Sequence, residues 1–437
     1  MDSSATGGER LASGAAAGTG LFGWYRELGG KERKTFWACF GGWSLDSMDV
    51  NLYSFVIPTL IGLWGMTRAD AGMLATAALL SSALGGWVTG IVADRIGRVR
   101  ALQITVLWFA VFTALSALTN SYSQLMVVRI FQGFGFGGEW AAGALLIGEI
   151  IRDKHRGKGN GVVHSGWAVG WGAAALLYTF LFSVMPPEIA WRTLFAVGIV
   201  PALFVFFIRR FIEEPTAFVE MNRKYAAGAR RTSSLKIFSG GYLRITLLAS
   251  LLAVGAQGGF YAIMVWLPTY LKTTRGLSVL NTGGYLMVVI IASFIGYVVS
   301  AYLTDIIGRR KCFYLFAVCS VLTVLAYTFL PIGNTAMLFL GFPLGFFASG
   351  IYSPIGAFFN ELYPTEIRGS GVGFCFNFGR AVGALFPALV GSLSATIPLG
   401  EAIGFFAVGA YGVIVLAAAL LPETVGQALH SEAATAP

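Results

Sequence analysis

A short basic turn between two long apolar segments occurs twice in this chain, about two hundred residues apart. The copies, residues 94–98 and 305–309, share the order Asp, two residues, Gly, Arg, and the glycine of each turn follows an earlier glycine by eleven or twelve residues. That glycine lets two helices approach closely, the Asp can cap the next helix, and the arginines can stay in the lipid headgroup layer. Two copies in corresponding places predict two homologous halves.

The apolar segments are long enough to cross a membrane. A soluble globular protein has about 25% charged residues, whereas this chain of 437 residues has 12%, is 56% hydrophobic and has a mean hydropathy of +0.72. At about 20 residues per span, the sequence predicts a multi-pass membrane protein with roughly twelve transmembrane helices. The predicted spans are residues 35–60, 71–93, 101–119, 122–150, 160–184, 191–212, 242–271, 281–304, 312–331, 335–361, 368–396 and 400–421.

The spans and the repeated turn together predict an all-α integral membrane fold, with twelve transmembrane helices in two pseudo-symmetric six-helix bundles. Residues 1–20 lack the apolar run of a signal peptide, so we expect them to stay in the mature chain. The predicted regions are a disordered cytoplasmic arm with an interfacial segment (1–34), an N-terminal bundle (35–212), a cytoplasmic linker (213–241), a C-terminal bundle (242–422) and a cytoplasmic tail (423–437).

The formal net charge of +9 could indicate nucleic acid, but the positions of the basic residues argue against that partner. Most of the 30 Lys and Arg residues fall in the N-terminal arm, the linker and the turns on one side of the predicted spans. The opposite side holds Arg68, Arg192, Lys272 and Arg275. This asymmetry predicts that both termini are cytoplasmic. Membrane lipids are the expected surroundings, in the inner (plasma) membrane of a bacterium.

The sequence carries no recognisable signature of a metal site, a cofactor site or an enzyme. Its four cysteines, Cys39, Cys312, Cys319 and Cys375, lie in or beside apolar segments without paired or metal-type spacing. The Gly-x-Gly-x-x-Gly match at residues 133–138 lies within a span and follows no strand, so it does not predict a nucleotide site. We therefore expect no bound metal or cofactor and no enzymatic activity.

Charged residues inside the spans are the first candidates for function, because each costs at least about 2.5–3.5 kcal/mol at the centre of a membrane helix. They are Asp46, Asp49, Arg129, Glu139 and Arg380. Asp46 and Asp49 are three residues apart and share a helix face, with Tyr53 one turn further on. Two carboxylates this close resist double ionisation, so one of them can take up and release a proton. Alternatively, either carboxylate only caps or pairs with a neighbouring helix.

Taken together, these features resemble the major facilitator superfamily of transporters, in which a loop of this kind joins the second and third helices of each half. The resemblance covers about residue 31 to 424. It implies alternating access between the two halves, with the substrate site near the midplane of the membrane.

The fourth predicted span carries the motif Arg129-x-x-x-Gly133-x-Gly135, which resembles a motif of the superfamily. In its sugar porters this Arg pairs with a first-helix Asp that releases it on protonation. By position Asp49 resembles that Asp, so the resemblance implies that Asp49, or Asp46 beside it, carries the proton and that Arg129 senses its charge. A permanent structural ion pair is the alternative. Glu139 is expected to be a second proton site or a fixed partner for a basic group.

The resemblance also implies a gate of ion pairs at the cytoplasmic helix ends. Residues 149–157 and 361–369 each contain an acidic helix end followed by Arg-Gly, in equivalent places of the two halves. With the basic turns, they are expected to hold the outward-facing state and to break when the protein opens inward. The predicted gate residues are Asp94, Arg95, Arg98, Glu149, Arg156, Asp305, Arg309, Arg310, Glu361 and Arg368.

Arg380 is the predicted substrate ligand, because a guanidinium deep in an apolar helix should face a cavity, and its planar fork suits a carboxylate. Pairing with Glu361 or another acid is the alternative. A lone His is more often a hydrogen-bonded core residue than a proton relay, and aromatic residues in spans more often pack than bind. The further cavity candidates are Asn377, Tyr53, His164, Gln257 and Tyr261, together with Trp167 and Trp266.

The Asp-x-x-Asp, Gly-Gly-Glu-Trp and Asn-x-Gly-Arg motifs of the first, fourth and eleventh spans resemble the sialate, monocarboxylate and aromatic-acid:proton symporter branches. This resemblance implies proton-coupled uptake of a small organic anion, such as a monocarboxylate, an aromatic acid or a sialic acid-like acid, by a monomer. A proton antiporter that exports drugs or metabolites is the nearest alternative. A non-transporting sensor is less favoured, because it would normally carry a signalling domain.

Overall fold

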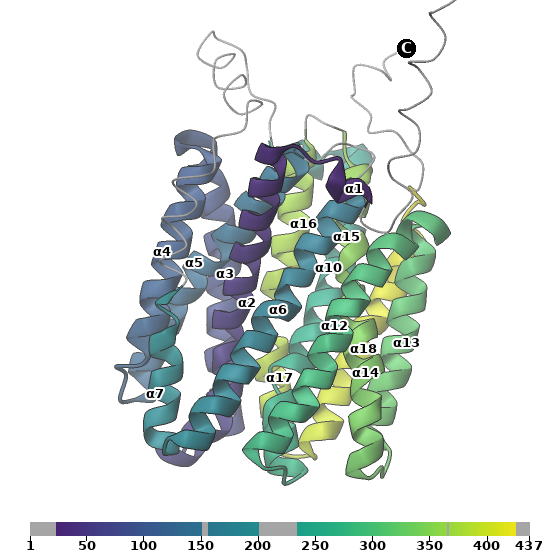
Figure 1. The fold of residues 1–437 in the computed structure, drawn as a ribbon. Helices are drawn as coiled ribbons and strands as arrows, with labels where there is room; N and C mark the ends of the chain where they lie inside the picture. The colour runs from purple at the N-terminus through teal and green to yellow at the C-terminus, as the bar shows by residue number, and fades with distance from the viewer. Residues whose placement is uncertain (1–22, 151–155, 201–233, 365–366, 425–437) are drawn as a thin grey trace, which may run out of the picture.

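The computed structural model of the chain describes residues 23–150, 156–200, 234–364 and 367–424. Within these ranges, nothing is described for the side chains of residues 90–91, 93–95, 98, 138–150, 156–157, 160, 234 and 368–369. Long helices run side by side along one axis of the molecule (Figure 1).

The helices fall into two sets, one before and one after residues 201–233. The first set is α1 (Gly23–Arg26), α2 (Gly30–Trp64), α3 (Arg68–Ile96), α4 (Arg98–Ser116), α5 (Tyr122–Ile150), α6 (Arg156–Val184) and α7 (Pro187–Val197). The second set is η2 (Ser234–Phe238), α10 (Gly240–Met264), α11 (Leu267–Thr269), η3 (Tyr270–Thr274), α12 (Val279–Ile307), α13 (Arg309–Phe329), α14 (Asn334–Gly350), α15 (Tyr352–Leu362), α16 (Arg368–Gly383), α17 (Phe386–Leu393) and α18 (Leu399–Leu420).

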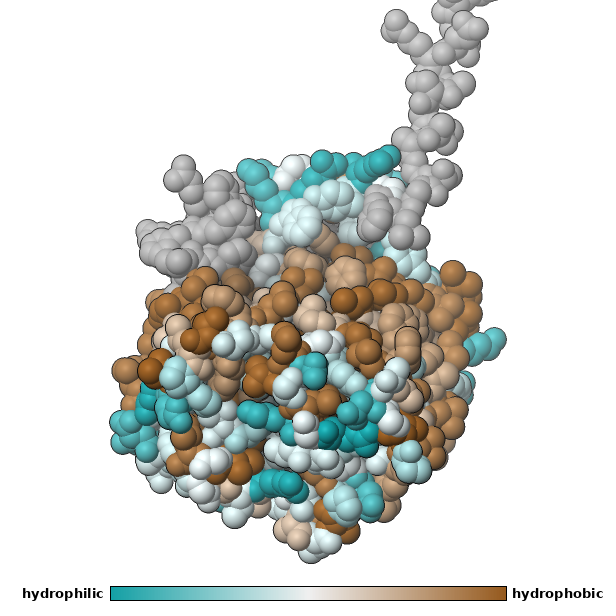
Figure 2. Space-filling view, turned by 60° about the horizontal axis from the view of Figure 1, so that its bottom comes forward, coloured by the Kyte–Doolittle hydropathy of each residue, from teal (hydrophilic) through white to brown (hydrophobic). Residues whose placement is uncertain are grey.

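The lengths and compositions of these helices confirm the predicted membrane fold. Among the described residues, nine helical stretches are long and apolar enough to cross a membrane. The 35-residue α2 is not one of the nine, and it carries Asp46 and Asp49. Figure 2 shows apolar side chains over the flanks of the bundle and hydrophilic ones gathered on the end that faces the viewer. The apolar flanks are the surface that lipid tails would cover.

The first span begins at Gly30, five residues before its predicted start. The Glu32 carboxylate accepts a hydrogen bond from the Gly29 backbone N (2.6 Å), which caps this helix end. Trp24 and Leu28, from the predicted interfacial segment, pack in an apolar cluster with residues of α2 and α4. The predicted linker is described only from residue 234 and the sixth span only to residue 200, while residues 1–22 and 425–437 lie outside the described ranges.

Equivalent helices of the two halves meet through equivalent small residues. In the N-terminal half, Gly133 of α5 lies against the Ala78 carbonyl oxygen of α3. In the C-terminal half, Gly345 of α14 lies against the Val289 carbonyl oxygen of α12 in the same manner. A Cβ at either glycine would overlap that oxygen, so only glycine allows these helices to approach so closely.

The two halves meet through α6 with α12 and through α3 with α16 and α17. At the end of the bundle opposite α1, the Ala388 backbone N donates to Thr76 Oγ1 across this interface (3.2 Å). A Cβ at Gly72 would lie 2.5 Å from the Pro387 carbonyl oxygen. The halves are therefore in tight contact at this end.

Candidate functional site

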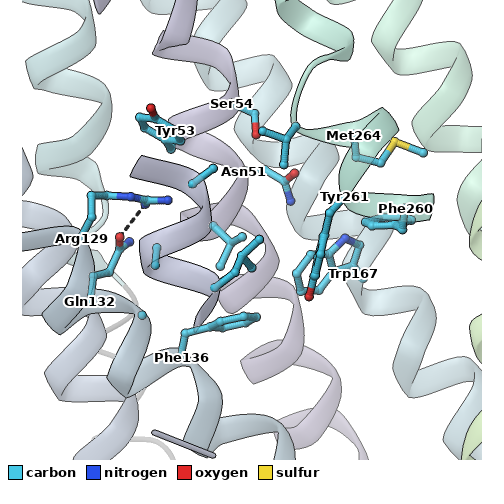
Figure 3. Close-up of a pocket in the computed structure, with 16 residues that line it drawn as sticks. Asn51, Tyr53, Ser54, Arg129, Gln132, Phe136, Trp167, Phe260, Tyr261 and Met264 are labelled. Carbon is cyan, nitrogen blue, oxygen red and sulfur yellow. Dashed lines mark hydrogen bonds between the residues drawn. The ribbon is translucent and has the colours of Figure 1, made fainter. Parts of the chain in front are cut away.

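A small cavity of about 40 Å³ lies between the two halves (Figure 3). It has room for only a few water molecules. Helices of both halves contribute to its wall. The lining residues are Val50, Asn51, Tyr53 and Ser54 of α2, Ala75, Ala78 and Leu79 of α3, Arg129, Gln132, Gly133 and Phe136 of α5, Trp167 of α6, Phe260, Tyr261 and Met264 of α10, and Val265 after it.

Arg129 is the charged residue on the described wall of the cavity, and its guanidinium is held in place from three directions. Its Nη1 donates to Gln132 Oε1 (2.5 Å), and Gln132 Nε2 in turn donates to Thr113 Oγ1 of α4 (2.6 Å). The guanidinium carbon lies 4.5 Å from the centre of the Tyr53 ring. Arg129 also interacts electrostatically with Asp49 of α2. Arg129 is only 4% exposed, so these contacts stand in for part of its hydration, while its Nε has no hydrogen-bond partner among the described residues.

Asp46 and Asp49 are both fully buried, but each interacts with a different arginine. Asp49 interacts with Arg129 of the N-terminal half, and Asp46 with Arg380 of the C-terminal half. Residues three apart on a helix point about 60° away from one another around its axis. Two carboxylates on one face of α2 can therefore interact with guanidinium groups on two different neighbouring helices.

Arg380 of α16 is 1% exposed and lies between the Phe136 and Phe376 rings, with its guanidinium carbon 5.1 and 5.2 Å from their centres. It also interacts electrostatically with Tyr261. Its Nε and Nη1 have no hydrogen-bond partner among the described residues. Arg380 itself does not line the cavity, whereas Phe136 and Tyr261, which contact it, do.

The other predicted substrate ligands mostly lie behind the cavity wall. Gln257 Nε2 donates to the Phe376 carbonyl (2.8 Å), and its Oε1 accepts from the Tyr261 hydroxyl (3.2 Å). Asn377 Nδ2 donates to the Gly373 carbonyl (3.0 Å). His164 is buried with its ring 5.8 Å from that of Trp43. Of the six predicted substrate ligands, Tyr53 and Tyr261 reach the cavity.

Aromatic side chains form much of the wall, and apart from Tyr53, Trp167 and Tyr261 they were not among the predicted site residues. Phe136 and Trp167 come from the N-terminal half, and Phe260 and Tyr261 from the C-terminal half (Figure 3). Their ring centres are 6.2 Å apart for Phe136 and Trp167, 6.4 Å for Trp167 and Phe260, and 6.3 Å for Phe260 and Tyr261. Because 14% of the chain is aromatic, aromatic content alone could not single these residues out.

The predicted gate residues that are described lie together in the C-terminal half. Arg309 Nη1 contacts Asp305 Oδ1 (2.6 Å), and Arg309 Nη2 contacts Glu361 Oε1 (2.8 Å). Glu361 therefore pairs with Arg309 and not, in this conformation, with Arg380. Arg310 instead donates to backbone carbonyls of α18. No side chain is described for the remaining proton and gate candidates, which are Glu139, Asp94, Arg95, Arg98, Glu149, Arg156 and Arg368.

A duplicated helical bundle with buried acids and guanidinium groups around a small cavity between its halves is the architecture of a secondary transporter. The chain matches the Major Facilitator Superfamily over residues 39–387, and it belongs to that family. The predictions of a multi-pass membrane transporter, and not an enzyme, are thereby confirmed.

The relatives of the chain confirm the predicted branch of the family. A probable 4-methylmuconolactone transporter of Cupriavidus pinatubonensis is 42% identical over 414 residues, which cover 94% of this chain and 95% of the relative. The cis,cis-muconate transport protein of Acinetobacter baylyi is 30% identical and covers 84% of this chain and 88% of its own length. The sialic acid transporter NanX of Escherichia coli is 24% identical, with 90% and 95% covered.

Solved structures confirm the fold. The partially occluded inward-open form of the xylose transporter XylE from Escherichia coli superposes with a TM-score of 0.73 at 16% sequence identity. The match covers 92% of this chain and 100% of that chain. At this identity, the likeness concerns the fold alone.

Proposed function

We propose that this protein takes up a small organic carboxylate together with protons by alternating access between its two halves. The proposal rests above all on two buried acid–guanidinium interactions, Asp49 with Arg129 and Asp46 with Arg380. The second of them acts between the N-terminal and the C-terminal half. Ionisable groups inside a membrane are costly and are characteristic of proton and ion routes. A proton added to Asp49 would weaken the first interaction, and an anion bound to Arg380 would weaken the second.

In this mechanism Asp49 carries the proton and Arg129 senses its charge. Protonation of Asp49 removes the negative charge that faces Arg129, while Gln132 and the Tyr53 ring still hold the guanidinium. The interaction between α2 and α5 then weakens, while the Arg129 guanidinium keeps its contacts with Gln132 and Tyr53. A change at these helices reaches the cavity directly, because Arg129, Gln132 and Tyr53 all line it.

The carboxylate of the substrate would bind Arg380. Its Nε and Nη1 lack hydrogen-bond partners among the described residues, so an oxygen of the carboxylate could accept from either of them. A bound anion would compete with Asp46 for this guanidinium and so weaken an interaction between the halves. Phe136 and Tyr261 separate Arg380 from the small cavity, so we expect their side chains to shift when substrate enters.

The remaining wall favours a flat, unsaturated or aromatic organic acid. Phe136, Trp167, Phe260 and Tyr261 surround the cavity with ring faces and edges, and such rings bind flat apolar groups well. The names of two relatives, which refer to 4-methylmuconolactone and cis,cis-muconate, support this substrate class. We place the protein in a bacterial inner membrane with cytoplasmic termini, in line with an Escherichia coli relative named as an inner membrane metabolite transport protein.

A thermal-shift screen of the purified protein tests the substrate class. The panel contains muconate, muconolactone, aromatic carboxylates and sialic acid, the amide of each acid, and a set of lipophilic cations. A ligand at 100 times its dissociation constant stabilises a protein by about 2.7 kcal/mol. We expect this shift for one or more flat carboxylates and not for their amides. Stabilisation by the cations alone would contradict the proposal and favour a drug exporter.

A further inference from the structure

A second hollow, separate from the central cavity, lies at the helix ends on the α1 side of the C-terminal half. It has a volume of about 390 Å³. Its walls are Arg244, Ile245 and Leu248 of α10, Arg310 of α13, and residues 419–422 at the end of α18. Two guanidinium groups therefore border one groove whose remaining walls are largely apolar.

Arg310 is fixed at this groove by the end of α18. Its Nε donates to the Ala418 carbonyl (2.7 Å) and its Nη2 to the Ala419 carbonyl (2.9 Å). Its Nη1 has no hydrogen-bond partner among the described residues. The Glu423 carboxylate accepts from the Arg310 backbone N (3.0 Å), so the start of α13 is already capped by the protein. The guanidinium, and not the helix terminus, is the group that remains for a ligand.

Arg244 lies in the first turns of α10 and is exposed. Within the described part of the chain it forms neither a hydrogen bond nor an ion pair. Two like charges on one groove repel unless an anion lies between them. Guanidinium groups bind phosphate oxygens especially well, because their planar donors match the spacing of those oxygens.

Exposed leucines continue from the groove along both helices that border it. On α10 they recur every four residues, at Leu243, Leu247 and Leu251, and on α18 they are Leu416 and Leu420. We propose that the groove binds the headgroup of an anionic phospholipid, such as phosphatidylglycerol, with its acyl chains along these leucines. Basic pockets between membrane helices at headgroup level bind such lipids, whereas a free phosphate would gain nothing from the leucines.

Native mass spectrometry of the purified full chain, titrated with phosphatidylglycerol, tests this site. Arg244→Gln should weaken binding roughly fivefold, the effect expected for one basic group near a membrane surface. Lys311→Gln is the matched control, because Lys311 is exposed on the neighbouring α13 but does not line the groove. Arg244 makes no described polar contact, so its variant should keep the melting temperature of the unmodified protein.

Two further probes separate this lipid from other ligands. Phosphatidylcholine should bind several-fold more weakly and should not respond to Arg244→Gln, and inorganic phosphate should not displace the bound lipid. Unchanged phosphatidylglycerol binding by Arg244→Gln, or an equal loss with Lys311→Gln, would overturn the proposal in favour of diffuse attraction to the charged surface. Displacement by inorganic phosphate would overturn it in favour of a site for a soluble anion.

Discussion

In vesicles that contain Asp49→Asn, an imposed pH gradient should no longer drive accumulation of the substrate above its outside concentration. Asparagine has nearly the same shape as aspartate but cannot take up a proton at this position. The Arg129 guanidinium, held by Gln132 and the Tyr53 ring, should stay in place, so the cavity should survive. Exchange of labelled for unlabelled substrate should therefore persist at a reduced rate. The measurement is uptake of labelled substrate with and without the gradient.

Asp46→Asn is the matched control, because Asp46 is buried on the same helix one turn away but interacts with Arg380. We expect this variant to change substrate affinity and to retain concentrative uptake. If Asp49→Asn lost exchange and accumulation equally, the residue would be structural and not a proton carrier. If Asp46→Asn alone lost accumulation, Asp46 and not Asp49 would be the proton carrier.

Arg380→Lys should weaken the binding of carboxylates by roughly tenfold or more while sparing uncharged analogues. Lysine keeps the positive charge but loses the planar fork, and a hydrogen bond to a charged group contributes about 1.5–3 kcal/mol. A difference of about 1.4 kcal/mol already changes a dissociation constant tenfold. Binding of the best carboxylate and of its amide, measured by calorimetry on both proteins, gives the comparison.

Arg192→Lys is the matched control for this substitution. Arg192 donates to the carbonyls of Ala117 (2.6 Å) and Thr119 (2.8 Å) and does not line the cavity. The same change of side chain there should leave the affinity for the carboxylate as it is. Unchanged affinity in Arg380→Lys would mean that Arg380 only joins the two halves through Asp46.

The fold was largely predictable because span length and apolar composition are direct consequences of membrane thickness. The predicted span 122–150 coincides with α5, and the span 160–184 differs from α6 only at its start. The contact of Arg309 with Asp305 was also predictable, since residues four apart on adjoining helix ends can meet. The glycine before each repeated turn was predicted to allow close helix contact, and a Cβ at Gly86 or Gly296 would overlap a carbonyl oxygen of a neighbouring helix.

The residues that face the cavity were much less predictable. In a soluble helix an apolar stripe marks the buried face, but a membrane helix is apolar on both sides, because one contacts lipid and the other contacts helices. The charge of Arg380 made it a candidate, yet the ring of Phe136 separates it from the cavity in this conformation. Asp46 and Asp49 do lie on one helix, but only the three-dimensional arrangement assigns them to different arginines.

The central claim, that an anion and protons move together, is tested most directly by the pH inside proteoliposomes. The vesicles enclose a pH indicator, and labelled carboxylate is added outside. We predict that the lumen becomes more acidic at a rate proportional to uptake, and that vesicles with Asp49→Asn respond no faster than protein-free vesicles. A lumen that becomes more alkaline during uptake, or uptake with no change of pH, would contradict the account.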